Sequence, residues 1–273
     1  MILKHGSKEY EIGKKLAEAS AYRTYICTDV ATGRELLLLI AKDVAGNGPL
    51  ERAAYVLGEL QETSDLFEAE YAKTGADKKL HYDHLFPELV DSFVSTEQGG
   101  RRVNIVAFRK IEHIRQLVPL SNLALVDGLR IDLKTSAWIM GRILKLLAFA
   151  HGEGIAIRAL GRNNILIEPD IHKMVIFDWS SAQMYPSGVP KQVRKDNITT
   201  AAHAVLEAVG ANPASDVFPY PAELDDASRR YFAYLRRLAS SRESDAGKVH
   251  TQFYDLLNEL YGRKFHPFTT LPL

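Results

Sequence analysis

Strand patterns and helix patterns occupy different parts of this 273-residue chain, which limits the folds that it can adopt. Three β-rich runs open the chain, namely YEIGKKL, YRTYICTD and ELLLLIAK. One helical pattern follows, and then two further β-rich runs, ELVDSFVST and RRVNIVAFRK. Beyond these runs the sequence is mainly helical. Segregation of this kind predicts an α+β fold with two lobes, because α/β folds alternate strands and helices along the chain.

The helical pattern of the first part begins at Pro49, a residue suited to the first turn of a helix. The apolar residues that recur there at helical spacing are Leu50, Ala54, Leu57 and Leu60. The polar stretch 61–84 is interpreted as an insertion, and its segment DLFEAEYAK is expected to be additional helix. We therefore expect residues 1–112 to form an N-lobe with a five-stranded sheet and one long helix that carries this insertion.

Residues 113–273 are expected to form a helical C-lobe, and the two lobes together form one domain. The clearest helix is LKTSAWIMGRILKLLAFAHGEG, which two glycines end. Its apolar face consists of Ile139, Ile143, Leu146, Leu147 and Ala150. A loop is expected around YPSGVPKQVRKD. The remaining helices are predicted over NITTAAHAVLEAVG, DDASRRYFAYLRRLASS and DAGKVHTQFYDLLNELYG.

Charge and composition argue against several classes of partner. The 34 basic and 34 acidic residues balance, so no overall charge favours nucleic acid or a membrane surface. No apolar run is long enough to span a bilayer, and no secretory signal is visible at the start. Cys27 is the only cysteine, which excludes an intramolecular disulfide. We expect a cytoplasmic protein that binds neither nucleic acid nor membrane.

The most informative stretch is GIAIRALGRNNILIEPDIHKMVIFDW. It is similar in spacing to the protein kinase catalytic loop H-R-D-x-x-x-x-N and the D-F-G that follows it. The order of strands and helices also resembles the protein kinase fold over nearly the whole chain. Two further stretches, IDLKTSAWIMGRILKLLAFAHGEG and the C-terminal tail, resemble a divergent group of bacterial kinase-like proteins that lack the catalytic-loop aspartate.

This resemblance implies that the catalytic groups are missing. Ala159 stands at the position of the catalytic aspartate, and a methyl group can neither accept nor orient a hydroxyl proton. Leu39 stands at the position of the lysine that contacts the α- and β-phosphates, and Ala53 at that of its helix glutamate partner. Losing both ionic partners together is physically reasonable, because a lone buried charge is costly whereas an apolar pair is not.

The phosphate-covering loop is altered as well, because Ala17, Ala19 and Tyr22 stand at its three glycine positions. Their side chains should obstruct the approach of backbone N–H groups to phosphate. Lys14, Lys15 and Lys42 are candidate substitutes for the missing lysine, but Lys42 is expected to cap the strand end in solvent.

Asn164 and Asp178 match the two metal-binding positions of the family. They leave open residual binding of Mg²⁺–ATP, because oxygen ligands suit Mg²⁺ when phosphates complete its shell. The structural alternative, which we favour, is that Asn164 ties its own loop together and Asp178 accepts hydrogen bonds from nearby backbone amides.

The resemblance also gives expectations for the surrounding positions. Asp196 is expected to hydrogen-bond the catalytic-loop backbone, and Ile157 and Trp179 are expected to pack as an apolar column beside Leu57. The segment between Ser180 and Asp196 is too short for a long activation loop with a substrate-docking segment.

Three other features carry weaker signals. His81 and His84, with Asp83 nearby, form a weak metal-site signal because no further ligand has suitable spacing. Cys27 lies in an apolar strand and is expected to be core instead of a nucleophile. The run RRYFAYLRRL is expected to be a helix with an apolar inner face and solvated arginines.

The sequence therefore predicts a pseudokinase, a kinase-fold protein that binds a protein partner and does not transfer phosphate. No catalytic residue and no cofactor are expected. The alternative is a divergent serine/threonine-kinase-like enzyme that binds Mg²⁺–nucleotide through Asn164 and Asp178 and carries out a non-standard transfer. The enlarged helix with its insertion is the expected partner surface.

Overall fold

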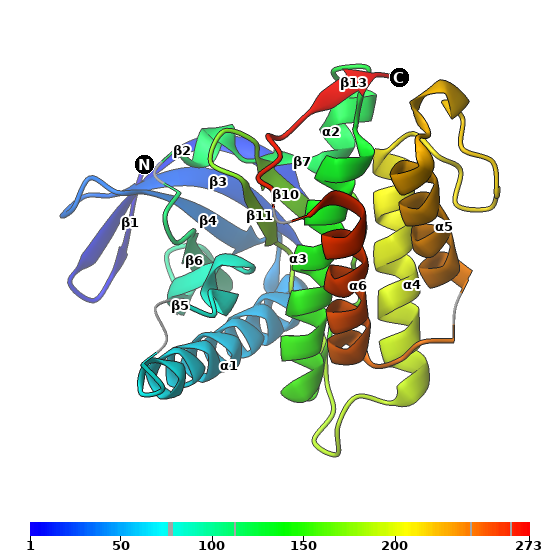
Figure 1. Ribbon diagram of the computed structural model, residues 1–273. Coiled ribbons are helices and arrows are strands. Elements are labelled where there is room, and N and C mark those ends of the chain that lie inside the picture. Colours follow the sequence, from blue (N-terminus) through cyan, green and yellow to red (C-terminus); the bar gives the residue numbers. More distant parts are fainter. Residues whose placement is uncertain (76–78, 112, 241, 263) are drawn as a thin grey trace. The chain divides into compact units, whose positions relative to one another are not determined.

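The computed structural model describes residues 1–75, 79–111, 113–240, 242–262 and 264–273 (Figure 1). It contains two compact units. The first comprises Met1–Leu117 together with Phe177–Ala182, and the second comprises Val118–Ile176 and Gln183–Leu273. Residue 112, where the lobe boundary was predicted, and residues 76–78 of the predicted insertion lie outside the described residues.

The first unit is built on an antiparallel sheet of six strands in the order β1-β2-β3-β4-β6-β5. The strands are β1 Ile2–His5, β2 Lys8–Glu18, β3 Tyr22–Asp29, β4 Glu35–Ala41, β5 Glu88–Ser95 and β6 Arg101–Ala107. All five predicted strands are present, but the prediction of a five-stranded sheet is wrong by one edge strand. The missed strand β1 pairs with β2 through a two-residue turn, at which Gly6 has a φ of 58°.

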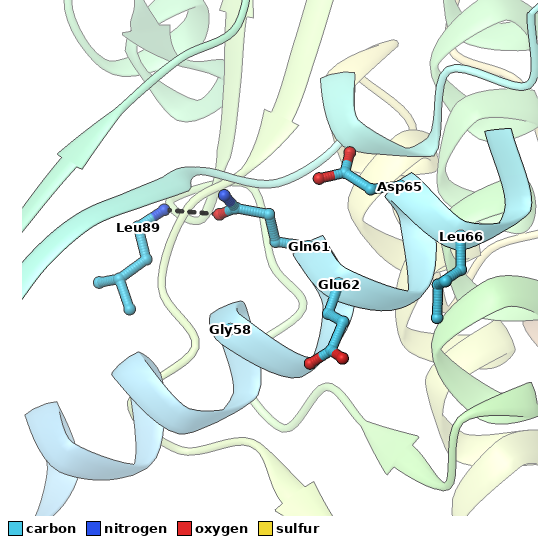
Figure 2. A pocket seen from close by; sticks show the side chains of 6 residues that line it. All are labelled: Gly58, Gln61, Glu62, Asp65, Leu66 and Leu89. Atoms are coloured by element: carbon cyan, nitrogen blue, oxygen red, sulfur yellow. Dashed lines mark hydrogen bonds between the residues drawn. The ribbon is translucent and has the colours of Figure 1, made fainter. Parts of the chain in front are cut away.

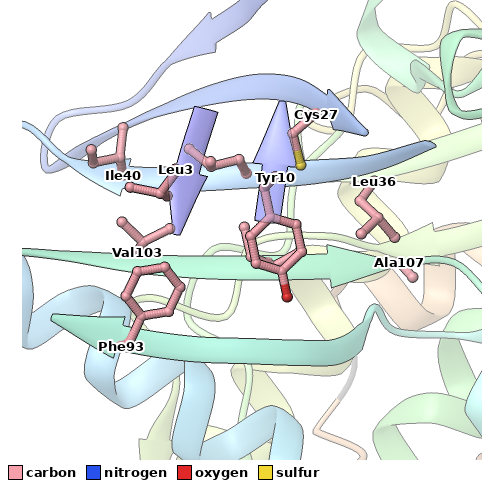
Figure 3. Close-up of a cluster of buried hydrophobic side chains, with 10 residues drawn as sticks. Leu3, Tyr10, Cys27, Leu36, Ile40, Phe93, Val103 and Ala107 are labelled. Atoms are coloured by element: carbon pink, nitrogen blue, oxygen red, sulfur yellow. The ribbon is translucent and has the colours of Figure 1, made fainter. Parts of the chain in front are cut away.

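One face of this sheet carries a hydrophobic cluster (Figure 3). The cluster joins residues of all six strands: Leu3, Tyr10, Cys27, Leu36, Leu38, Ile40, Phe93, Val103, Ile105 and Ala107. Strand β1 contributes Leu3, which is buried in the cluster and explains why so short an edge strand is retained. Burial raises the pKa of the Cys27 thiol to about 12, with a smaller contribution from Asp29. The thiol therefore stays protonated, and the prediction of a core cysteine is confirmed.

Helix α1, Asn47–Ala72, packs on the sheet of the first unit. The four predicted apolar positions are all buried, together with Ala53, Val56 and Ser64. The helix runs without a break through the segment DLFEAEYAK as far as Ala72, so the predicted additional helix is confirmed. The 3-10 helices η1, Val44–Gly46, and η2, Tyr82–His84, lie before and after α1 in the sequence. A third, η3, Ile114–Gln116, follows β6.

The second unit is mainly helical, and α3, α4, α5 and α6 lie side by side within it (Figure 1). Its helices are α2 Leu120–Leu125, α3 Leu133–Gly152, α4 Lys191–Ala208, α5 Asp226–Ser240, α6 Ala246–Tyr261 and the 3-10 helix η4 Pro221–Glu223. The predicted inner face of α3 is fully buried. Among the described residues, no helix is both long and apolar enough to span a lipid bilayer.

Short strands complete the second unit. They are β7 Val118–Pro119, β8 Leu129–Ile131, β9 Ile155–Ala156, β10 Ile165–Glu168, β11 Lys173–Ile176, β12 Gln183–Met184 and β13 Thr270–Pro272. Strands β9 and β10 flank the segment that resembles a catalytic loop, and β10 and β11 form a hairpin. Strand β13, near the C-terminus, pairs with β8, a partner that no local pattern could reveal.

Helix α4 starts earlier than the sequence indicates. We expected a loop as far as residue 196, but the helix begins at Lys191, directly after Pro190. The first turns carry exposed polar residues and therefore lack the apolar periodicity that marks a helix. Helix α5 has the predicted amphipathic form, with Tyr231, Phe232 and Leu235 buried and Arg229 and Arg230 exposed.

Candidate functional site

The segment that resembles a catalytic loop is closed by its own asparagine. The side chain of Asn164 is buried, and its Nδ2 donates to the carbonyl oxygen of Ala159 at 2.8 Å. Its backbone N–H donates to the carbonyl of Gly161 at 2.9 Å. The first contact is the loop-tying hydrogen bond that the structural alternative predicted. At residue 159 the chain thus offers a methyl group and a carbonyl that is already bonded.

Asn197 of α4, not Asp196, holds the backbone of this segment, and the prediction for Asp196 is wrong. Asn197 Oδ1 accepts from the N–H of Ile157 at 3.3 Å, and its Nδ2 donates to the carbonyl of Ile157 at 2.6 Å. Asp196 is exposed and accepts from Gln192 at 2.7 Å. Because α4 buries one face only, a shift of one position exchanges the buried residue for an exposed one.

His151, on α3, joins the same cluster through a ring nitrogen. Its Nε2 lies 3.0 Å from Oδ1 of Asn197. Burial lowers the pKa of His151, although the hydrogen bond with Asn197 opposes this. We therefore take the imidazole as neutral at physiological pH, with Nε2 donating its hydrogen to the amide oxygen.

Asp178 lies in the segment Phe177–Ala182, which belongs to the first unit, and Tyr22 is its neighbour there. Oδ1 of Asp178 accepts from the N–H of Ser180 at 2.8 Å. The hydroxyl of Tyr22 is hydrogen-bonded to the side chains of Asp178 and Ser180. Burial raises the pKa of Tyr22 most strongly, and the charge of Asp178 raises it further. The phenol is therefore protonated and donates to the carboxylate.

The two positions at which the resemblance places an ion pair carry hydrocarbon side chains. Leu39 of β4 and Ala53 of α1 are both buried, and both line a cavity that also touches Leu57, Asp178 and Trp179. This cavity has a volume of about 10 Å³. Such a volume holds one water molecule at most. The packing of Trp179 near Leu57 agrees with part of the predicted apolar column, and Trp179 also contacts Phe86 edge-on, with ring centroids 6.4 Å apart.

The hairpin at the position of the glycine-rich loop is short and tied down. Strands β2 and β3 are joined by three residues, and the N–H of Ala19 donates to the carbonyl of Tyr22 at 2.9 Å. The carbonyl of Ala21 accepts from the N–H of Lys42 at 2.9 Å. A Cβ atom on Gly46 would lie 2.4 Å from the same carbonyl, so the hairpin tip packs against bare backbone.

Lys42 was expected to cap the strand end in solvent, but it forms an ion pair instead. Its Nζ lies 2.8 Å from Glu18, which also pairs with Lys15 at 3.0 Å. Hydrogen bonds from Lys42 and Lys15 lower the pKa of Glu18 to about 2. Two of the candidate substitutes for the missing lysine are thus engaged with a carboxylate of the hairpin.

Two solved structures resemble the chain over nearly its whole length. The BubR1 kinase domain matches with a TM-score of 0.64 and 11% identity, over 95% of this chain and 83% of that chain. Vaccinia related kinase 3 matches with a TM-score of 0.62 and 12% identity, over 95% and 90% of the two chains. The chain has a protein kinase-like fold. No protein-family model matches it, and no curated protein matches it by sequence.

The protein kinase-like fold confirms the predicted α+β class, with a strand-rich unit and a helical unit. At this level of identity the similarity shows the fold alone, so the chemistry has to be judged from the residues present. Kinases of this fold use Mg²⁺–ATP, which needs open carboxylate oxygens and a charge for the phosphates. In the first unit Asp178 is bonded to Tyr22, and Leu39, where the resemblance places the lysine, is buried and uncharged. These residues do not fit Mg²⁺–ATP in the arrangement observed.

Sequence reasoning missed the bond between Tyr22 and Asp178 and the role of Asn197. Tyr22 was identified as an obstruction, but its hydroxyl was not assigned a partner. The signal that could have pointed to Asp178 was the hydroxyl of Tyr22, because it is a polar group at a position that aligns with a glycine of the phosphate loop. For Asn197 the available signal was its amide, which can both donate to and accept from one backbone residue.

Proposed function

We propose that this protein is a pseudokinase, which acts by binding a protein partner and does not transfer phosphate. The observation that carries the proposal is the hydrogen bond from Tyr22 to Asp178. It occupies the carboxylate that an active kinase would use for metal with a phenol from the hairpin that would cover the phosphates. Ala159, Leu39 and Ala53 support the same conclusion, because none of them offers an ionisable group.

Nucleotide binding would require the protein to undo this arrangement. A hydrogen bond to a charged group contributes about 1.5–3 kcal/mol, and a buried phenol left without its partner adds a desolvation cost. The buried leucine at position 39 offers no charge to phosphate in return. We therefore expect any affinity for Mg²⁺–ATP to be weak.

The proposal extends the resemblance to divergent bacterial kinase-like proteins without the catalytic aspartate, and a cytoplasmic location is part of it. The alternative is a divergent serine/threonine-kinase-like enzyme that holds Mg²⁺–nucleotide through Asn164 and Asp178. The two proposals differ in a measurable way, because only the alternative needs the carboxylate of Asp178 to be released from Tyr22.

The test is a thermal-shift titration of the purified protein with ATP, with and without Mg²⁺, beside the Asp178→Asn variant. A ligand at 100 times its Kd adds ~2.7 kcal/mol to the free energy of unfolding, which is easily detected. We expect no saturable shift at millimolar nucleotide. A Mg²⁺-dependent shift that Asp178→Asn abolishes, together with transfer of phosphate from labelled ATP, would establish the alternative.

The partner surface that we propose is a groove lined by α1 and β5 (Figure 2). It has a volume of about 530 Å³ and is lined by Gly58, Gln61, Glu62, Asp65 and Leu66 of α1 and by Leu89 of β5. Gln61 fixes one wall, because its Oε1 accepts from the N–H of Leu89 at 3.2 Å. The missing side chain of Gly58 leaves room, and Leu66 is 57% exposed.

The charge of this groove indicates the chemistry of its partner. Both ionisable lining residues, Glu62 and Asp65, are acidic. Asp65 pairs with Arg109 at 3.1 Å, whereas Glu62 has no cationic partner among the described residues. We propose that the groove binds a protein segment that presents an apolar side chain next to lysine or arginine.

A matched pair of charge reversals tests this surface. Glu62→Lys should weaken the binding of a basic, leucine-containing peptide about tenfold. Glu59→Lys should leave it nearly unchanged, because Glu59 is an exposed residue of the same helix that does not line the groove. Fluorescence anisotropy over a peptide library gives the affinities. Equal losses in both variants, or no preference for basic peptides, would contradict the proposal.

A further inference from the structure

A cluster of metal-ligating side chains lies between α1 and β5, outside the site described above. His81, Asp83 and His84 each bring one ligand atom within 4.8 Å of the others. The short helix η2 places Asp83 and His84 in one turn, and His81 precedes it with a left-handed φ of 57°. The two imidazole rings stack, with centroids 4.5 Å apart and planes inclined by 18°. Spacing along the sequence gave only a weak signal for this set.

One atom of the cluster has no hydrogen-bond partner in the described structure. Oδ1 of Asp83 is buried and receives no hydrogen bond, although it lies 3.9 Å from Nε2 of His84. The other carboxylate oxygen, Oδ2, accepts from Arg109 at 2.8 Å. Buried carboxylate oxygens are rarely left unsatisfied, and a bound cation is one way to satisfy such an oxygen.

We propose that His81, Asp83 and His84 bind a divalent transition-metal ion, with Zn²⁺ as the best match. Two imidazoles with one carboxylate suit Zn²⁺ and its neighbours in the first transition row, whereas Mg²⁺ and Ca²⁺ prefer oxygen ligands throughout. Three protein ligands leave a fourth tetrahedral position for water or a further side chain.

The observed geometry is close to what Zn²⁺ requires. Bonds of about 2.0–2.2 Å in a tetrahedral site place neighbouring ligand atoms about 3.4 Å apart. The distance from His84 Nε2 to Asp83 Oδ1 is 3.9 Å, and all three ligand atoms lie within 4.8 Å of one another, so closure on the ion shortens this pair by about half an ångström and no pair by more than about 1.4 Å. Arg109 orients the carboxylate through its other oxygen, as an outer hydrogen-bond partner does in many metal sites.

Metal binding at this position would reinforce contacts between segments of the first unit that are distant in the sequence. The N–H of His81 donates to the carboxylate of Glu68, which belongs to the C-terminal half of α1. Arg109 follows β6 and also pairs with Asp65 of α1. A metal ion held by His81, Asp83 and His84 would therefore fix the connection from α1 to β5 against the end of β6.

The experiment uses the full chain, stripped with a chelator and titrated with Zn²⁺ against a chromophoric competitor. We expect one equivalent to bind, and the affinity to fall at least tenfold in His81→Ala and in His84→Ala. His5→Ala is the control, because His5 also lies beside a carboxylate, 3.0 Å from Asp91, but belongs to no group of three possible ligands among the described residues. This control should bind Zn²⁺ as the unaltered protein does.

A spectroscopic arm keeps the proposal testable if an alanine variant is unstable. Co²⁺ substituted for Zn²⁺ should give the visible absorption of a four- or five-coordinate site in the unaltered protein, and Asp83→Asn should change it. Binding of several weak equivalents, or equal affinity in His84→Ala and His5→Ala, would overturn the proposal. So would a Co²⁺ spectrum of the six-coordinate aqueous type at saturation.

Discussion

At the position of Tyr22 the kinase pattern has a glycine, and the phenol that replaces it reaches Asp178. A carboxylate offers about four lone-pair sites. In this chain one is used by the N–H of Ser180 and another by the Tyr22 hydroxyl. Leu39, where the resemblance places a lysine, offers no charge to phosphate. On the neighbouring strands β3 and β4, Tyr22 and Leu39 thus contribute a hydrogen bond to Asp178 and a buried apolar side chain.

Removal of the Tyr22 hydroxyl should destabilise the protein. Tyr22→Phe leaves the carboxylate of Asp178 without its phenol donor and should lower the free energy of unfolding by about 1–3 kcal/mol. Urea denaturation at pH 7 measures the change. In an Asp178→Asn background the same substitution should cost less, because the group that then loses the phenol donor carries no charge. Equal costs in the two backgrounds would show that the two side chains are not coupled.

Two adjacent residues of α4 should differ sharply in their importance. Asn197→Ala removes both hydrogen bonds to Ile157 and the acceptor of His151, and should lower the free energy of unfolding by about 2–4 kcal/mol. Asp196→Ala changes an exposed side chain and should stay within about 0.5 kcal/mol. Chemical denaturation of the two variants measures the difference. A larger effect at Asp196 would contradict the assignment of the buried position to Asn197.

Among the structural elements, the β2–β3 hairpin depends on one glycine outside it. A Cβ atom on Gly46 would lie 2.4 Å from the carbonyl of Ala21, which is backbone and cannot swing away. Gly46→Ala should therefore displace the hairpin tip and lower the free energy of unfolding by about 1–3 kcal/mol.

Gly48→Ala is the matched control for this prediction. Gly48 lies in the first turn of α1, and a methyl group there would have no atom within 4 Å, so alanine should be neutral or stabilise the helix by up to about 1 kcal/mol. Thermal unfolding compares the two variants. The hypothesis of a tightly packed hairpin tip would be wrong if Gly46→Ala were as stable as Gly48→Ala.

Most elements could be predicted from the sequence, because their patterns are local. The five strands and the helices α1, α3, α5 and α6 have alternation or helical spacing that needs no knowledge of their partners. Strand β1 and the β8–β13 pair escaped prediction, since a strand of three or four residues is defined by the strand it pairs with. The start of α4 escaped for a different reason, because its exposed first turns carry no apolar pattern.

At the candidate site, the absence of the kinase groups stays a prediction, and the contacts present there were foreseen only in part. Leu39, Ala53 and Ala159 could be placed from spacing alone, and the first two are buried as hydrocarbon should be. The roles of Asn164 and Asp178 in metal binding stay predictions. The bond from Tyr22 to Asp178 joins residues far apart in the sequence, and only the folded chain brings the phenol and the carboxylate together.

Across the whole molecule, several buried tyrosines share one electrostatic property. Burial is the main cause that raises the pKa of Tyr10 and Tyr22 in the first unit and of Tyr231 and Tyr261 in the second. For Tyr261 the pKa rises to about 12. Tyr231 is fully buried, and its hydroxyl lies 2.9 Å from that of Ser136. In each case the folded state favours the neutral phenol, so the folded state holds these protons more tightly than the unfolded chain.

The sign of the resulting pH dependence follows from linkage. An unfolded tyrosine ionises near pH 10, whereas these phenols stay protonated in the folded protein to higher pH. Their contribution to stability is therefore complete below about pH 9 and is lost as the pH rises through 10 and above. Each phenol that ionises only on unfolding lowers the free energy of unfolding by about 1.4 kcal/mol per pH unit in that range.

Urea denaturation between pH 7 and pH 11, with phenolate absorbance recorded on the folded protein, measures this loss of stability. We expect a decline that steepens above pH 10 while the phenolate signal of the folded state stays well below that of the unfolded chain. Tyr231→Phe removes one phenol that ionises only on unfolding. In this variant the free energy of unfolding should therefore fall less steeply with pH, by about 1.4 kcal/mol per pH unit. Full ionisation of all tyrosines near pH 10 with the fold intact would show that these phenols are open to water.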